Sequence, residues 1–149
     1  MTRFIGSRSR TFDPMNRGTT SEAPSCEPAV SNSARTIVVF ESRSRWEPEL
    51  QRQFLDEPVR VRGCRKWSEL SSQSADAIVI ELPSDAASCL QWLGTFMTRP
   101  RMTPVLVICP TDAADLEWPL RDAGVREVIV GELDGERLAR SCRRLWSSS

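Results

Sequence analysis

The side chains that could carry chemistry stand at the ends of buried, β-branched runs of the sequence. Glu41 and Glu81 each follow such a run, and Cys109 follows another. Carboxylates can bind a metal ion or transfer protons, and a thiolate can act as a nucleophile. The chain contains no His, which excludes Ser-His-Asp and Cys-His catalysis, His metal ligands and a phospho-accepting His. We therefore expect a regulatory or binding domain rather than an enzyme.

The charge balance and the cysteine spacing limit the class of protein further. The 149 residues carry 20 basic and 20 acidic side chains, which removes the electrostatic case for a protein that binds nucleic acid or a membrane with its whole surface. The five Cys are irregularly spaced, with no Cys-x-x-Cys pair, so we expect free thiols, no metal and no cofactor. No apolar run approaches the roughly 18 residues of a membrane span. The N-terminus also lacks the apolar segment of a secretory signal, so we expect a cytoplasmic location.

The distribution of apolar residues divides the chain into a tail and one domain. Residues 1–34 hold too little apolar surface to fold, and we expect a disordered tail that acts as a tether or as a partner-binding segment. Residues 35–146 alternate strand and helix patterns, and residues 147–149 form a short C-terminal tail. The strand patterns are Thr36–Phe40, Val59–Arg62, Ala77–Ile80, Val105–Ile108 and Val128–Val130. Such alternation predicts a parallel sheet covered by helices on both faces, with the alternating Val59–Arg62 half-exposed near an edge.

Polar residues that favour helix ends follow several of these strands. Ser84 or Asp85 is expected to cap one helix, Thr111 or Asp112 the next, and Asp134 the last. Pro119 lies inside the helix that follows Thr111, where it predicts a kink or a new helix start.

Two segments resemble those of response-regulator receiver domains. Residues 76–83, DAIVIELP, are similar to the strand and Pro around that family's phospho-acceptor, and residues 121–130, RDAGVREVIV, to its Ala-Gly-Ala turn into the last strand. The resemblance spans residues 35–146. It implies a flavodoxin-like fold, a doubly wound five-stranded parallel sheet of order 2-1-3-4-5 with helices on both faces. Ligands of such sheets bind beyond the carboxyl ends of the strands.

The family's phosphorylation chemistry does not transfer to this sequence. Its acidic Mg²⁺-binding pair corresponds to Phe40 and Glu41, its acceptor Asp to Glu81, its hydroxyl to Cys109 and its Lys to Gly131. We therefore expect a pseudo-receiver that takes up neither Mg²⁺ nor a phosphodonor. Glu81 either imitates a phosphorylated Asp or is a solvated carboxylate. Cys109 is either redox-sensitive or inert, and nearby Glu41 and Glu81 would disfavour its thiolate.

The remaining features concern partners. Residues 43–66 are mostly basic and residues 112–136 mostly acidic, which either steers a protein partner or self-association or is ordinary solvated surface. Trp92 and Trp118 lie off the apolar stripes of their helices and are candidate interface anchors. The resemblance adds a candidate partner surface of Trp118, Arg121, Arg137 and Arg140. A small nucleotide- or ligand-binding domain or enzyme remains an alternative, although no Gly-x-Gly-x-x-Gly or Walker loop follows Phe40. Nucleic-acid binding through the last helix is a weaker alternative.

Overall fold

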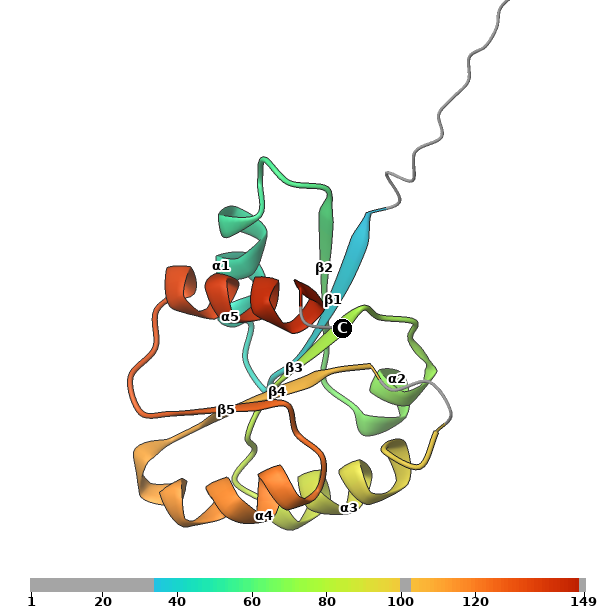
Figure 1. Ribbon diagram of the computed structural model, residues 1–149, viewed down its shortest axis with the longest axis vertical. Coiled ribbons are helices and arrows are strands. Elements are labelled where there is room, and N and C mark those ends of the chain that lie inside the picture. Colours follow the sequence, from blue (N-terminus) through green and yellow to red (C-terminus); the bar gives the residue numbers. More distant parts are fainter. Residues whose placement is uncertain (1–33, 100–102, 148–149) are drawn as a thin grey trace, which may run out of the picture. The chain divides into compact units, whose positions relative to one another are not determined.

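The five buried runs form the strands of one parallel sheet (Figure 1). The computed structural model describes residues 34–99 and 103–147. Its strands are β1 (Arg35–Phe40), β2 (Val59–Cys64), β3 (Ala77–Glu81), β4 (Val105–Cys109) and β5 (Glu127–Val130). They are arranged in the order β2-β1-β3-β4-β5, as expected for a flavodoxin-like fold. The expected N-terminal tail, apart from Ala34, lies outside the described residues, as do residues 148–149.

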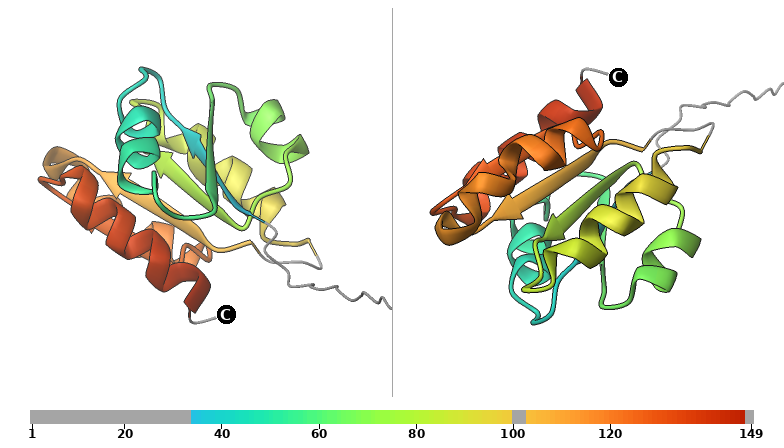
Figure 2. Two further views of the ribbon diagram at one scale, coloured as in Figure 1. Left: turned by 90° about the horizontal axis from the view of Figure 1, so that it is seen from above. Right: turned by 90° about the horizontal axis from the view of Figure 1, so that it is seen from below.

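Helices cover both faces of this sheet (Figure 2). The helical segments are α1 (Trp46–Gln53), α2 (Trp67–Ser72), α3 (Ala86–Phe96), the 3₁₀ helix η2 (Thr111–Leu116), α4 (Glu117–Asp122) and α5 (Gly135–Ser147). α1 and α5 pack on one face, and α2, α3 and α4 pack on the other. Among the described residues, no helix is both long enough and apolar enough to cross a membrane.

Each face of the sheet has its own apolar core, because successive side chains of a strand point to opposite faces. In β1, Ile37 and Val39 pack with α1 and α5, whereas Val38 and Phe40 pack with α2, α3 and α4. β2 is an edge strand with a single neighbour. Its Val61 is buried while Arg60 and Arg62 are exposed, which confirms the predicted half-exposed strand.

The helix starts are predicted correctly in two places and wrongly in one. Asp85 accepts a hydrogen bond from Ser88 N at 3.4 Å, and Asp134 accepts one from Arg137 N at 2.8 Å. Neither Thr111 nor Asp112 caps a helix, since Pro110 precedes η2 and no side chain caps it. Pro119 lacks an N–H and would clash with the preceding turn of a continuous helix. The segment therefore divides into η2 and α4, with Pro119 in the first turn of α4.

Candidate functional site

A cleft of about 720 Å³ opens at the carboxyl edge of the sheet. Loops after β3, β4 and β5 and the start of α1 form its wall, which includes Arg45, Trp46, Glu81, Cys109, Thr111 and Gly131. The structure thus brings together three of the five residues expected at the degenerate site, namely Glu81, Cys109 and Gly131. Phe40 and Glu41 do not line this cleft.

The Glu41 carboxylate caps the amino end of α1. Glu41 Oε1 accepts hydrogen bonds from the backbone N–H of Arg45 at 3.1 Å and of Trp46 at 2.8 Å. Its Oε2 accepts one from Glu47 N at 3.0 Å, and the side chain is only 2% exposed. The N–H groups and the dipole at a helix start stabilise a buried negative charge. Both oxygens of Glu41 therefore already accept hydrogen bonds from the backbone, a role that the pattern of residues does not reveal.

Phe40 is part of a column of aromatic rings in which Trp67 is half-buried and the other three are buried. Its ring stacks on Trp67 with centroids 3.8 Å apart and planes inclined by 13°. Trp67 in turn lies 5.6 Å from Trp92, and Trp92 lies 4.4 Å from Phe96. We use the name aromatic column for these four residues. An apolar ring thus occupies the position that the sequence resemblance assigns to a Mg²⁺-binding carboxylate.

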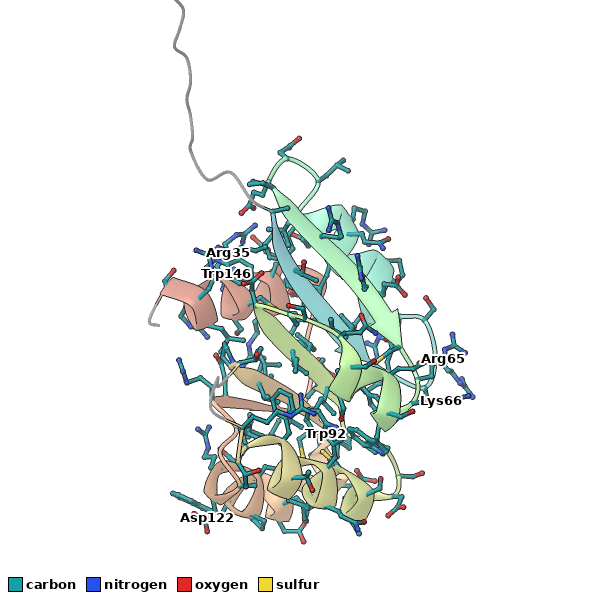
Figure 3. The ribbon with its side chains drawn as sticks, turned by 90° about the vertical axis from the view of Figure 1, so that its right-hand side faces the viewer. Arg35, Arg65, Lys66, Trp92, Asp122 and Trp146 are labelled. Atoms are coloured by element: carbon teal, nitrogen blue, oxygen red, sulfur yellow. The ribbon has the colours of Figure 1, made fainter. Side chains whose placement is uncertain are left out.

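The aromatic column corrects the prediction for Trp92, which is no interface anchor. Trp92, labelled in Figure 3, is only 8% exposed. Its indole N–H donates to Ser71 Oγ at 2.8 Å. It falls off the apolar stripe of α3 because it packs sideways against α2, which itself presents Trp67. A stripe calculated for one helix cannot reveal such a helix–helix contact.

Glu81 ends β3 with a half-buried side chain. Its Oε2 accepts a hydrogen bond from the indole N–H of Trp46 at 3.2 Å. The Arg45 guanidinium lies 4.3 Å from the centre of the Trp46 ring, which places a cation beside the same wall of the cleft. Trp46 therefore orients the Glu81 carboxylate, while Arg45 contacts the Trp46 ring.

The Cys109 thiol is buried and donates to the Ala113 carbonyl at 3.1 Å. Burial is the main cause that raises its pKa, followed by the charges of Asp115, Glu117 and Asp112. The raised pKa disfavours the thiolate. The carboxylates responsible belong to η2 and α4, however, and not to Glu41 and Glu81 as expected.

Gly131 has a φ of +94°, a left-handed conformation that side-chain-bearing residues rarely adopt. A Cβ built there would meet only Thr111 Oγ1, at 3.7 Å, which is an ordinary contact. The backbone conformation, and not a lack of space, therefore favours Gly at the position that the sequence resemblance assigns to the family's Lys.

The donors at this edge do not fit a Mg²⁺ ion. Mg²⁺ requires hard oxygen ligands in nearly octahedral geometry. Phe40 offers none, and the oxygens of Glu41 already accept backbone hydrogen bonds. The described residues also contain no group of three or more Cys, Asp or Glu able to hold a metal ion.

The four residues expected at a partner surface lie on two helices, Trp118 and Arg121 on α4 and Arg137 and Arg140 on α5. Trp118 is 74% exposed. Arg121 forms an ion pair with Glu117 at 3.1 Å, and Arg140 one with Glu136 at 3.7 Å. Arg137 donates to the Glu132 carbonyl at 3.2 Å.

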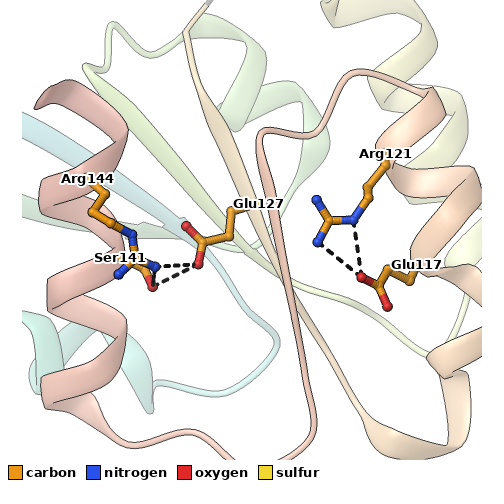
Figure 4. A network of polar contacts seen from close by, with 5 residues as sticks. All are labelled: Glu117, Arg121, Glu127, Ser141 and Arg144. Atoms are coloured by element: carbon orange, nitrogen blue, oxygen red, sulfur yellow. Dashed lines mark hydrogen bonds and ion pairs between the residues drawn. The ribbon is translucent and has the colours of Figure 1, made fainter. Parts of the chain in front are cut away.

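Besides the Glu117–Arg121 pair, Figure 4 shows a group of polar contacts that joins β5 to α5. Ser141, which is 1% exposed, donates to Glu127 Oε2 at 3.0 Å, and Arg144 pairs with the same oxygen at 2.9 Å. The network fixes α5 against β5, while the Glu117–Arg121 pair stays within α4.

The fold is a flavodoxin-like parallel sheet, and its cleft lies beyond the carboxyl ends of the strands. No family model and no curated protein matches the sequence. Solved structures do match. The receiver domain of the Francisella response regulator 1452 has a TM-score of 0.65 at 13% identity, and the match covers 76% of this chain and 98% of that domain.

Two further solved structures are similar to this chain. The signal receiver domain of a signal transduction histidine kinase from Syntrophus aciditrophicus matches at 20% identity with a TM-score of 0.63, covering 77% of this chain and 92% of that one. A CpaE2 pilus assembly protein described as putative, from Sinorhizobium meliloti, matches at 22% identity with a TM-score of 0.59, covering 74% of this chain and 98% of that one. The chain therefore has the receiver fold, as the sequence resemblance implied.

Proposed function

We propose that this chain is a non-catalytic, receiver-like signalling module that acts through protein contacts and is not phosphorylated. The observation that carries the proposal is the burial of Glu41 as the cap of α1, with Phe40 stacked on Trp67 beside it. Where the family has an Mg²⁺-binding acidic pair, this chain has a structural carboxylate and an aromatic ring. A cytoplasmic location is part of the proposal.

Phosphoryl transfer depends on groups that this site lacks. The reaction needs positioning and strong stabilisation of the negative charge that develops on the phosphoryl oxygens. Gly131 supplies no cation, and Glu81 is one methylene longer than Asp, which displaces its carboxylate from an acceptor Asp position. We infer that the domain keeps a single conformation and that its protein partners recognise this conformation without a phosphorylation cycle.

Intact-mass spectrometry tests this proposal. The protein is incubated with Mg²⁺ and a small phosphodonor, alongside the variant Glu81→Gln and an active receiver domain as positive control. We expect no mass increase for either form of this chain while the positive control gains one phosphoryl group. A phosphoryl adduct on the natural chain that is lost in Glu81→Gln would refute the proposal.

A second candidate function is the binding of a small ligand in the cleft. Its volume of about 720 Å³ falls within the range of small-molecule sites. A ligand that binds only the folded state raises the melting temperature. A thermal-shift panel of nucleotides and flavins supports this candidate if one compound stabilises the natural chain but not a variant in which Thr111→Leu narrows the cleft.

A further inference from the structure

The edge of the sheet at β2 carries a row of exposed basic side chains. We name as the basic edge Arg60 and Arg62 in β2 together with Arg65 and Lys66, which follow it. Val61 packs into the core with α1 and α5, so Arg60 and Arg62 project from the opposite face of the strand. Within residues 34–99 and 103–147, none of these four side chains forms an ion pair. Their charges are therefore available to a partner.

The segment from the end of η2 through α4 carries the complementary groups. Asp115 in η2 and Trp118 and Asp122 in α4 are all exposed, and Trp118 and Asp122 are four residues apart, the spacing of neighbours on one helix face. We name this set the acidic ridge. Neither aspartate forms an ion pair or a hydrogen bond through its side chain within the described part of the chain, whereas Glu117 is paired with Arg121. The ridge thus presents a 74% exposed indole between two available carboxylates.

The two surfaces of one molecule lie too far around the domain to meet. β2 and β5 are the opposite edges of the sheet, and α4 packs beside β5. In Figure 3, Arg65 and Lys66 extend from one side of the domain and Asp122 extends from the other. Only a second copy can therefore bring a basic edge against an acidic ridge.

The chemistry of the two surfaces matches in type and in spacing. A guanidinium can stack on an indole face while it pairs with a carboxylate. Arg60 and Arg62 are about 6.6 Å apart along the strand. Trp118 and Asp122 are about 6 Å apart along the helix. One Arg can thus cover Trp118 while its neighbour reaches Asp122, and the zero net charge of the chain adds no overall repulsion.

We propose that copies of this chain associate head to tail, with the basic edge of one against the acidic ridge of the next. The inference deepens the proposed function, because it rests on action through protein contacts and names a second copy as the partner. Such a contact joins two different surfaces and leaves one of each free, so it extends into longer assemblies as the concentration rises.

Sedimentation velocity of the full chain tests the proposal. At an ionic strength of about 0.01 M, we expect the weight-average mass to rise above the 16.8 kDa of one chain as the concentration increases. At about 1 M the screening length falls from about 30 to about 3 Å, and the rise should be lost. A natural chain that stays monomeric at every concentration and salt level would overturn the proposal.

Two charge-reversed variants supply the matched test. The first, Arg60→Glu with Arg62→Glu, keeps the natural acidic ridge, and the second, Asp115→Arg with Asp122→Arg, keeps the natural basic edge. All four positions are exposed, so both variants should melt at the same temperature as the natural chain. Each alone should remain monomeric, and an equimolar mixture should associate through the two surfaces left intact.

A third variant separates this contact from one made by the last helix. Arg137→Glu with Arg140→Glu changes exposed charges of the same kind outside both surfaces, and we expect it to associate like the natural chain. If it becomes monomeric while the Arg60 and Arg62 variant still associates, the proposed contact is wrong. A failure to associate would leave the phosphodonor experiment unaffected, so the two proposals fail separately.

Discussion

Buried thiols are the groups whose ionisation the fold changes most. Burial raises the pKa of Cys64 to about 11 and the pKa values of Cys89 and Cys142 to about 12. All three side chains lie in the core, Cys64 and Cys89 on the α3 face and Cys142 on the α5 face. A thiol in the unfolded chain ionises near pH 9, so the folded state holds these protons to a higher pH.

We predict that the free energy of unfolding falls steeply in mild alkali. Protonated thiols stabilise the folded state fully below about pH 9, and this stabilisation is lost as the pH rises towards about 12. At about pH 10.5 the loss amounts to roughly 2 kcal/mol for each thiol with a pKa of about 12. The chain has no Tyr and a single Lys, so few other groups titrate in this range. Urea denaturation at several pH values between 8 and 10.5 measures how steeply the free energy of unfolding falls with pH.

The double variant Cys89→Ala with Cys142→Ala isolates the cause. Its stability is lower at pH 8 because two small cavities form, but its slope against pH should be much shallower. Lys66→Arg is the control, since it leaves every thiol in place, and its slope should match that of the natural chain. An unchanged slope in the cysteine variant would contradict the assignment.

Single residues also show the limit of what the sequence could predict at the site. The ends of the buried runs identified Glu81, Cys109 and Gly131, and these three do line one cleft. The role of Glu41 could not be predicted, because it depends on how the chain turns between β1 and α1. An acidic residue five positions before a helix is usually solvated, and only this turn brings it onto the free N–H groups.

At the scale of elements, the loop between α4 and β5 depends on one Gly. Gly124 has a φ of +106°, and a Cβ there would lie 3.1 Å from Met97 Cγ on the neighbouring segment. The conformation ends α4 and directs the chain into β5. Gly94 offers a contrast, because it lies in α3 with no atom within 4 Å of a built Cβ.

We predict that Ala has opposite effects at these two positions. Gly124→Ala should lower the free energy of unfolding by about 1–2 kcal/mol, the cost of a left-handed conformation for a residue with a side chain. Gly94→Ala should raise it by about 0.5–1 kcal/mol, since Ala favours a helix interior over Gly. Urea denaturation of both variants checks the pair, and shifts of the same sign would contradict this interpretation.

The elements themselves were largely predictable, for identifiable reasons. β-branched runs determined all five strands, and the alternation of Val and Arg correctly placed β2 at an edge. The order of the strands came from the receiver resemblance and not from periodicity. The prediction that Trp92 is an exposed interface anchor was wrong. The residue pattern of one helix does not indicate which neighbouring helix packs against it, and Trp92 packs on Trp67 of α2.

On the scale of the whole molecule, the described domain supplies its own core. Among the described residues, the members of the two apolar clusters lie between Ile37 and Trp146, and Ala34–Ser149 is one compact unit. We predict that a chain beginning at Ala34 unfolds in one transition at the melting temperature of the full chain. Differential scanning calorimetry of both forms measures this, and a fall of several degrees would mean that residues 1–33 contribute to stability.

The aromatic column also gives the domain an optical signature. Trp67 on α2 and Trp92 on α3 stack 5.6 Å apart, and the absence of Tyr leaves the indoles as the dominant near-ultraviolet chromophores. Stacked indoles couple their electronic transitions, so this pair produces a circular-dichroism band that depends on the contact between α2 and α3. The chain thus carries an internal reporter of that contact, one that needs no attached dye.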